Sequence, residues 1–71
     1  MNLEEIGNFI KARRQRIGVR QEDLAQMSGV NIKTIQQIEM STGNPSFETL
    51  SKLSEVLGLE IIVQIKANLN G

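Results

Sequence analysis

The sequence predicts a mainly α-helical domain of four helices, followed by one C-terminal β-strand. Three observations carry this prediction. Apolar residues recur at helical spacing in segments that end at glycines. Two short helical segments, 21–27 and 32–40, have only a few residues between them, including Gly29. In residues 59–66, the apolar Leu59, Ile61, Val63 and Ile65 alternate with the polar Glu60, Gln64 and Lys66, and this period of two is typical of a strand.

Residues 2–17 form the first expected helix. Asn2 can cap its start with Glu5 reaching back, and Gly18 is a natural stop after Ile17. Gly7 lies inside this helix at a cost of up to about 1 kcal/mol relative to alanine.

The central pair of helices depends on three residue types at defined spacing. Ala25 lets the second helix approach the first, Gly29 accepts the positive φ of an abrupt turn, and Ile35 fills the space between the helices. Further inward-facing positions are Leu24, Val30 and Ile38. With Ile35 inward, Lys33 and Gln37 point away from the core, with Gln36 and Met40 beside them.

The fourth helix follows the turn at residues 41–45, with Ser46 as its cap and Gly58 as its end. Its expected buried stripe consists of Phe47, Leu50, Leu53, Val56 and Leu57.

The expected strand at 59–66 has no partner within the chain. Its unpaired backbone groups would form an edge, and the same strand of a second copy can pair with it to make a homodimer. The strand residues are Leu59, Ile61, Ile62, Val63 and Ile65. A fifth helix is the alternative for this segment, although its β-branched residues favour a strand. We therefore expect a domain at 1–58, a dimerisation strand at 59–66 and a flexible tail at 67–71.

Composition excludes several classes of protein. The chain has 71 residues and a formal net charge of +0, but Lys11, Arg13, Arg14, Arg16 and Arg20 cluster in one segment, so one surface can still be positive. Cysteine and histidine are absent and no carboxylate pair can be placed at a pocket, so we expect no enzyme, metal or cofactor. No apolar run suits a signal peptide or a membrane span, which predicts a cytoplasmic protein.

The spaced residues from Gln21 to Leu53 together resemble the phage repressor/Cro-like, or XRE-type, helix-turn-helix family. The matching positions are Gln21, Leu24-Ala25, Gly29-Val30, Ile35, Ile38-Glu39, Pro45, Thr49-Leu50 and Leu53. The resemblance covers about Ile6 to Leu57. It implies a lambda-repressor-like four-helix domain whose third helix enters the major groove of double-stranded DNA.

The resemblance also implies residue roles. Base contacts would come from Asn31, Ile32, Lys33, Gln36 and Gln37, with Lys33 donating to guanine, Gln37 pairing with adenine and Ile32 touching a thymine methyl. Contacts to the DNA backbone would come from Arg14, Arg20, Gln21, Thr34, Asn44 and Ser46. Arg14 and Glu39 match a family ion pair that orients the third helix. Arg20 stands where the family usually has a capping threonine or serine, so a hydroxyl cap is lost and a cation is gained.

The segment LGLEIIVQIK at 57–66 resembles HipB-type antitoxin repressors, in which a strand after the last helix dimerises. That resemblance implies repression of the protein's own operon and binding of a neighbouring toxin protein. Two functions therefore stay open: a dimeric repressor that binds a palindromic operator, and an antitoxin-type module that neutralises a toxin.

Overall fold

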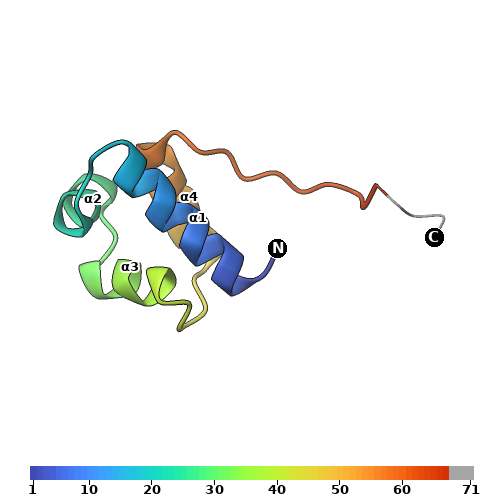
Figure 1. Ribbon diagram of the computed structural model, residues 1–71, viewed down its shortest axis with the longest axis horizontal. Coiled ribbons are helices and arrows are strands. Elements are labelled where there is room, and N and C mark those ends of the chain that lie inside the picture. The colour runs from blue at the N-terminus through green and yellow to red at the C-terminus, as the bar shows by residue number, and fades with distance from the viewer. Residues whose placement is uncertain (68–71) are drawn as a thin grey trace.

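Four helices followed by an extended C-terminal segment make up the computed structural model, which describes residues 1–67 (Figure 1). The helices are α1 (Leu3–Arg16), α2 (Gln21–Ser28), α3 (Ile32–Glu39) and α4 (Phe47–Leu57). In space α3 packs on α1 and α2, and α4 packs on α2. The four-helix prediction is confirmed, with element ends within one or two residues of those expected.

Side-chain caps at the helix starts explain where α1 and α4 begin. The Oδ1 of Asn2 accepts from the Glu5 amide at 2.8 Å, and a Glu5 carboxylate oxygen accepts from the Asn2 amide at 3.1 Å. Ser46 caps α4 through its Oγ, which accepts from the Thr49 amide at 3.1 Å. Each cap satisfies amides that have no partner within the helix.

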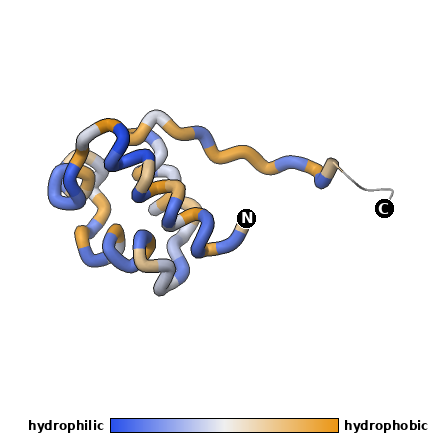
Figure 2. The backbone as a smooth tube through the Cα atoms, in the orientation of Figure 1, coloured by the Kyte–Doolittle hydropathy of each residue, from blue (hydrophilic) through white to orange (hydrophobic). Residues whose placement is uncertain are grey.

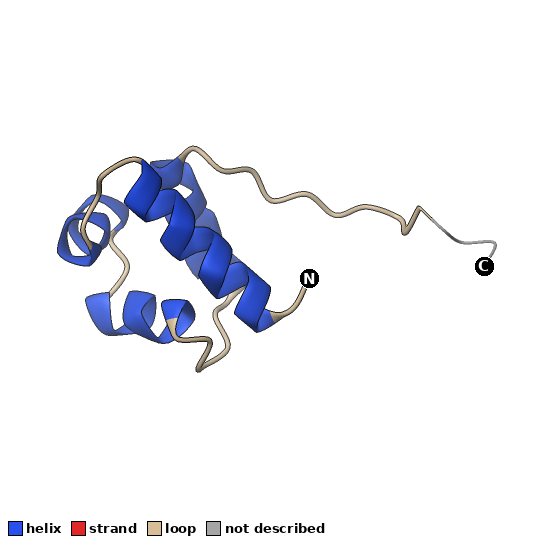
Figure 3. Ribbon diagram, viewed as in Figure 1, coloured by secondary structure: helices blue, strands red, loops and turns tan. Residues whose placement is uncertain are grey.

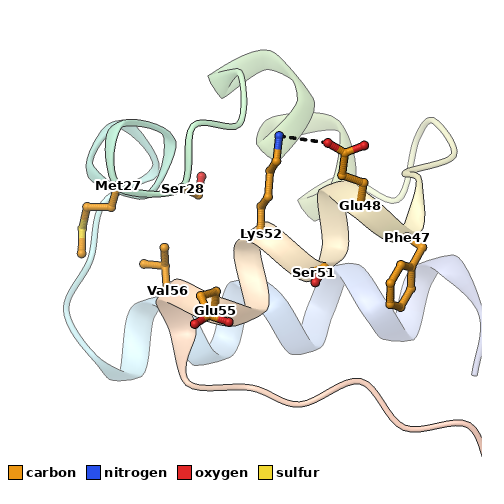
Figure 4. A pocket seen from close by; sticks show the side chains of 8 residues that line it. All are labelled: Met27, Ser28, Phe47, Glu48, Ser51, Lys52, Glu55 and Val56. Carbon is orange, nitrogen blue, oxygen red and sulfur yellow. Dashed lines mark ion pairs between the residues drawn. The ribbon is translucent and has the colours of Figure 1, made fainter.

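One cluster of apolar side chains forms the core, and it draws on all four helices and the turn between α2 and α3. Its buried members are Ile10, Leu24, Val30, Ile35, Ile38, Leu53 and Leu57. The expected burial of Phe47 is wrong, because its side chain is 69% exposed. Phe47 is the first residue of α4 and lies toward the opposite end of this helix from Val56 and from Met27 of α2 (Figure 4).

The C-terminal segment leaves the helical domain as an extended chain (Figure 1). Within residues 1–67 the single chain has no β-strand, and the alternative fifth helix does not form (Figure 3). A strand requires hydrogen bonds to a neighbouring strand, which one chain cannot supply here. The segment is largely hydrophobic (Figure 2), yet Val63 is 95% and Ile65 79% exposed.

Of the expected tail at 67–71, all but Ala67 lies outside the described residues. Among the helices of the described chain, none has the length and apolar character needed to cross a membrane.

Candidate nucleic-acid interface

The turn between α2 and α3 has the geometry that its sequence predicts. Gly29 adopts φ 76° and its amide donates to the Ala25 carbonyl at 3.0 Å, which closes α2. The Val30 amide then donates to Ser28 Oγ at 3.1 Å, and the Val30 side chain enters the core. The left-handed conformation at Gly29 therefore lets α3 start a new direction while remaining packed on α2.

The outward face of α3 is polar and exposed. Ile35 and Ile38 are buried on the inner face, whereas Lys33, Gln36 and Gln37 are exposed. At the start of the helix, Asn31 Oδ1 accepts from the Lys33 amide at 2.8 Å and so acts as the cap. The structure thus presents three long polar side chains on one surface of a rigid helix.

A hollow of about 240 Å³ lies between α3 and the start of α4. Its lining includes four residues that the sequence associates with DNA, which are Thr34, Gln37, Asn44 and Ser46. The structure therefore brings together expected base-reading and backbone-contacting groups from two helices and the loop between them.

The loop after α3 is fastened to the helix that carries Gln37. The Thr42 amide and hydroxyl both donate to the Gln37 carbonyl, at 2.9 Å and 3.3 Å. The Gln37 side chain lies beside Gly43, where a Cβ would be 3.6 Å from its Oε1. The two hydrogen bonds to the Gln37 carbonyl hold the loop close to the end of α3, and they place Gly43 beside the Gln37 side chain.

A buried ion pair links α1 to the end of α3. Arg14 Nε donates to Glu39 Oε2 at 2.7 Å and Arg14 Nη2 donates to Glu39 Oε1 at 2.8 Å, a bidentate arrangement. Arg14 Nη1 also donates to the Val19 carbonyl at 3.0 Å. Gln21 Nε2, at the start of α2, donates to Glu39 Oε1 at 3.0 Å. One carboxylate therefore fixes the relative positions of three helices.

The electrostatics of this network favour the charged pair. Burial acts to raise the pKa of Glu39, but hydrogen bonds from Arg14 and Gln21 and the positive charges of Arg14 and Lys11 outweigh it, so the pKa lies below its ordinary value. The hydrogen bond to Glu39 raises the pKa of Arg14 despite burial. Both groups remain ionised at neutral pH.

Arg20, just before α2, is held by a residue that the sequence analysis did not single out. Its Nε donates to Asp23 Oδ2 at 3.0 Å, and the Arg20 amide donates to the same oxygen at 3.3 Å. The hydrogen bond from Arg20 lowers the pKa of Asp23. Asp23 thus satisfies the Arg20 amide and orients the exposed guanidinium, while α2 has no side-chain cap for its own first amides.

The expected site residues fall into two groups. Lys33, Gln36 and Gln37 project from α3, whereas Arg14 and Glu39 are buried and bonded to each other. Sequence reasoning gave Asp23 no role, and it named Thr49 only as a position of the resemblance without predicting its contact with Ser46. The spacings Arg20-x-x-Asp23 and Ser46-x-x-Thr49 could have indicated both contacts. In each, the later residue stands three positions after the residue that precedes the helix, where its side chain can form a hydrogen bond with that residue.

A second, larger hollow of about 480 Å³ lies between α2 and α4, and none of the expected contact residues lines it (Figure 4). Met27, Phe47 and Val56 supply its apolar part, and Lys52 pairs with Glu48 at 3.3 Å on its rim. This hollow is separate from the polar one beside α3.

Comparison with known proteins agrees with this geometry. The helix-turn-helix family model matches residues 10–63. Repressor protein C2 of Salmonella phage P22 is 40% identical over 57 residues, which is 80% of this chain and 26% of that repressor. The chain thus spans about a quarter of the length of this relative.

A solved structure gives an independent likeness in three dimensions. The restriction-modification controller protein C.AhdI from Aeromonas hydrophila superposes with a TM-score of 0.78 at 29% sequence identity. The likeness covers 82% of this chain and 88% of the controller protein. The match of the family model over residues 10–63, together with the turn at Gly29 and the exposed polar face of α3, places this chain in the helix-turn-helix family.

Proposed function

We propose that this chain is a transcriptional repressor that binds a palindromic operator as a homodimer. The observation that carries the proposal is the surface of α3, where Lys33, Gln36 and Gln37 are exposed on a helix whose opposite side is buried by Ile35 and Ile38. A helix of this kind fits the major groove of double-stranded DNA, where each base pair presents a distinct pattern of donors and acceptors. The relatives named repressor and controller protein support a regulatory role.

The base contacts are assigned to the first half and the outer face of α3. Lys33 donates to guanine O6 and N7, Gln37 pairs with adenine N6 and N7, and Ile32 touches a thymine methyl. Gln36 and the free amide of Asn31 flank these contacts. The position of Gln37 supports its role, because it is exposed on α3 and lines the same hollow as Thr34, Asn44 and Ser46.

Contacts to the phosphates are assigned to the rim of this surface. Arg20 and Gln21 stand at the start of α2, and Thr34, Asn44 and Ser46 line the hollow between α3 and α4. Such contacts set the position of α3 in the groove without reading sequence. For Arg14 the buried bonds to Glu39 support an indirect role, in which it holds Gln21 and α3 in register with the phosphates.

A single α3 reads only a few base pairs, which is too short for a specific site. Two copies held about one helical turn of DNA apart would read both halves of a palindrome. The exposed apolar segment 59–66 supports this arrangement, because it can pair with the same segment of a second copy.

The direct test is a gel-shift titration with DNA from around the protein's own promoter, beside a scrambled duplex of equal length. We expect preferential binding to the promoter DNA that weakens steeply between about 50 and 200 mM salt. The same promoter fused to a reporter should be silenced by the protein. Equal binding to both duplexes, or no binding at low salt, would contradict the proposal.

The antitoxin-type function is a second candidate, and the apolar exposure of Ile62, Val63 and Ile65 favours it. An unpaired strand edge accepts a strand from another protein as readily as one from a second copy. The product of the adjacent gene, co-expressed with a tagged version of this chain, would co-purify with it and lose toxicity if this function holds. If the product of the adjacent gene does not bind this chain and is not toxic to the cell, the antitoxin-type function is ruled out.

A further inference from the structure

The C-terminal segment 59–66 has two faces of different character. Leu59 is half-buried and packs against the core, and residues two apart along an extended chain share a face with it. Those residues are Ile61, Val63 and Ile65, which are exposed in the single chain by 41%, 95% and 79%. The other face carries Glu60, Ile62, Gln64 and Lys66. One face is therefore wholly apolar and continues from the hydrophobic core of the domain.

Pairing of two such segments is restricted by this alternation. Residues directly opposite each other in a two-stranded sheet lie on the same face. A shift of one residue would set the apolar face of one strand against the polar face of the other. Only registers that set apolar residues of one strand opposite apolar residues of the other bury the exposed side chains of both copies. Successive registers of this kind differ by a shift of two residues along the strand.

Charge distinguishes among the remaining registers. Glu60 and Lys66 lie at equal distances on either side of Val63. An antiparallel pair centred on Val63 therefore sets Glu60 opposite the partner's Lys66, and the reverse pair forms by symmetry. A parallel pair in register would instead oppose Glu60 with Glu60 and Lys66 with Lys66, and like charges directly opposite each other are unfavourable.

We infer that two copies of this chain pair their 59–66 segments in an antiparallel register centred on Val63. Ile61 then lies opposite the partner's Ile65, Val63 lies opposite its own copy, and Ile62 lies opposite the partner's Gln64. The inference rests on the proposed homodimer and specifies its geometry.

The register creates one continuous apolar surface from Ile61, Val63 and Ile65 of both chains. Leu59 packs against the core of its own domain, so this apolar face leads into the helical domain at one end of each strand. A two-stranded sheet alone is only marginally stable in water. Side-by-side contact of the apolar side chains across the pair and the two ion pairs would add to the backbone hydrogen bonds.

Single cysteines test the register on a clean background, since the chain has no cysteine of its own. Each position from 61 to 65 is changed to cysteine in a separate variant, and disulfide-linked dimers are measured on non-reducing gels after mild oxidation. Opposite residues in an antiparallel pair lie about 4.5–5.5 Å apart at Cα, which suits a disulfide, whereas Cα separations above about 7 Å do not. We expect efficient cross-linking for Val63→Cys alone.

The neighbouring positions serve as matched controls with distinct signatures. Ile62→Cys and Gln64→Cys should fail separately but cross-link when the two variants are mixed. Self-linking of Ile62→Cys or Gln64→Cys would place the centre on that residue and overturn the inference. Equal self-linking at every position from 61 to 65 would indicate a parallel pair and overturn it as well.

Charge reversal gives a second, independent readout. Glu60→Lys and Lys66→Glu should each raise the dimer dissociation constant by roughly tenfold or more, because each variant replaces two opposite-charge pairs with two like-charge pairs. The double variant with both changes should return to within about threefold of the wild type. A double variant as weak as the single variants would refute the pairing of Glu60 with Lys66.

Failure of the inference can be told apart from failure of the proposed function. A wild-type protein that is monomeric by light scattering at the concentrations used would remove the dimer itself. A dimeric wild type that binds promoter DNA but shows another cross-linking pattern would leave the repressor proposal intact and overturn only the register.

Discussion

Gly7 of α1 lies directly against the backbone carbonyl of Ile38 in α3. A Cβ built at position 7 would overlap this oxygen, and it would also lie 3.3 Å from Ser41 Oγ. The residue is buried, although it sits in a helix that is otherwise rich in good helix formers. Glycine at this position lowers helix propensity, but it allows α1 to pack closely against α3, the helix that carries the proposed DNA contacts.

Gly7→Ala should destabilise the protein, although the same change in an exposed helix position stabilises by up to about 1 kcal/mol. The backbone of Ile38 cannot yield as a flexible side chain would, so we expect a loss of about 1–3 kcal/mol in the free energy of unfolding. Urea denaturation followed by circular dichroism measures it. Asn8→Ala, at an exposed neighbouring position of α1, is the control and should be neutral or slightly stabilising.

Arg13 and Arg16 lie in the same last turn of α1 but should differ in their effect on stability. Arg13 Nε donates to the Leu57 carbonyl at 2.8 Å and so satisfies an unpaired group at the end of α4, whereas Arg16 is exposed. We expect Arg13→Ala to cost about 1–2 kcal/mol and Arg16→Ala to stay within about 0.5 kcal/mol of the wild type. Thermal unfolding of the two variants at one pH makes the comparison.

The Arg14–Glu39 pair should make stability depend on pH. The folded-state pKa of Glu39 is lowered from an ordinary value of 4.5, so its contribution is fully present above that pH and is lost as the pH falls through the lower folded value. Glu39→Gln removes this titration and leaves the buried Arg14 without its counter-charge. At pH 7 we expect the variant to be less stable by about 2–3 kcal/mol.

The difference between wild type and Glu39→Gln isolates this one group from the other carboxylates. It should be constant from pH 7 to about pH 5 and shrink steadily below pH 4.5. Denaturation curves at matched ionic strength for both proteins would show it. A difference that does not change with pH would mean that Glu39 has the same pKa in the folded and unfolded chains.

Local signals in the sequence were sufficient for the helices and the turn. The caps and the turn depend on contacts between residues only a few positions apart, as at Asn2 with Glu5, at Ser46 and at Gly29. Their roles can therefore be predicted without knowledge of the fold. The buried face of α3 follows in the same way from Ile35 and Ile38, because helical spacing alone places them on one side.

Contacts between distant segments were not predictable in this way. The clash that reserves position 7 for glycine, and the bond from Arg13 to the Leu57 carbonyl, depend on how α1 meets α3 and α4. Phe47 was expected inside because it shares the spacing of Leu50 and Leu53, yet it is 69% exposed at the first position of α4. Pairing of residues 59–66 requires a second chain, so one chain shows an extended segment only.

Gln37→Ala and Arg20→Ala should weaken DNA binding in different ways. Loss of a base contact at Gln37 should cost about 1–3 kcal/mol and relax the preference at one base pair. Loss of the cation at Arg20 should weaken binding to all sequences alike and reduce the slope of binding against salt by about one. Arg20→Lys, which keeps the charge, should retain the slope. Fluorescence anisotropy on operator variants at several salt concentrations separates the two effects.

Two adjacent prolines in the C-terminal segment should separate the proposed dimer without unfolding the helices. In a two-stranded sheet, alternate amides face the partner strand, so one of the two amides at residues 62 and 63 donates to the partner. The double variant Ile62→Pro/Val63→Pro lacks both amides and therefore removes that hydrogen bond. The helices should remain intact, because both side chains are exposed and lie outside the core. Ile62→Val/Val63→Ile keeps the amides and the β-branched side chains, and it serves as the control.

For the proline variant, light scattering should give the mass of one chain, and the circular dichroism spectrum should remain helical. Its affinity for a palindromic operator should fall far more than its affinity for a single half-site. The difference arises because only the two-site complex depends on the link between copies. A proline variant that remains dimeric would show that another surface holds the copies together. Equal losses on the full operator and the half-site would instead mean that residues 59–66 support DNA binding within one chain.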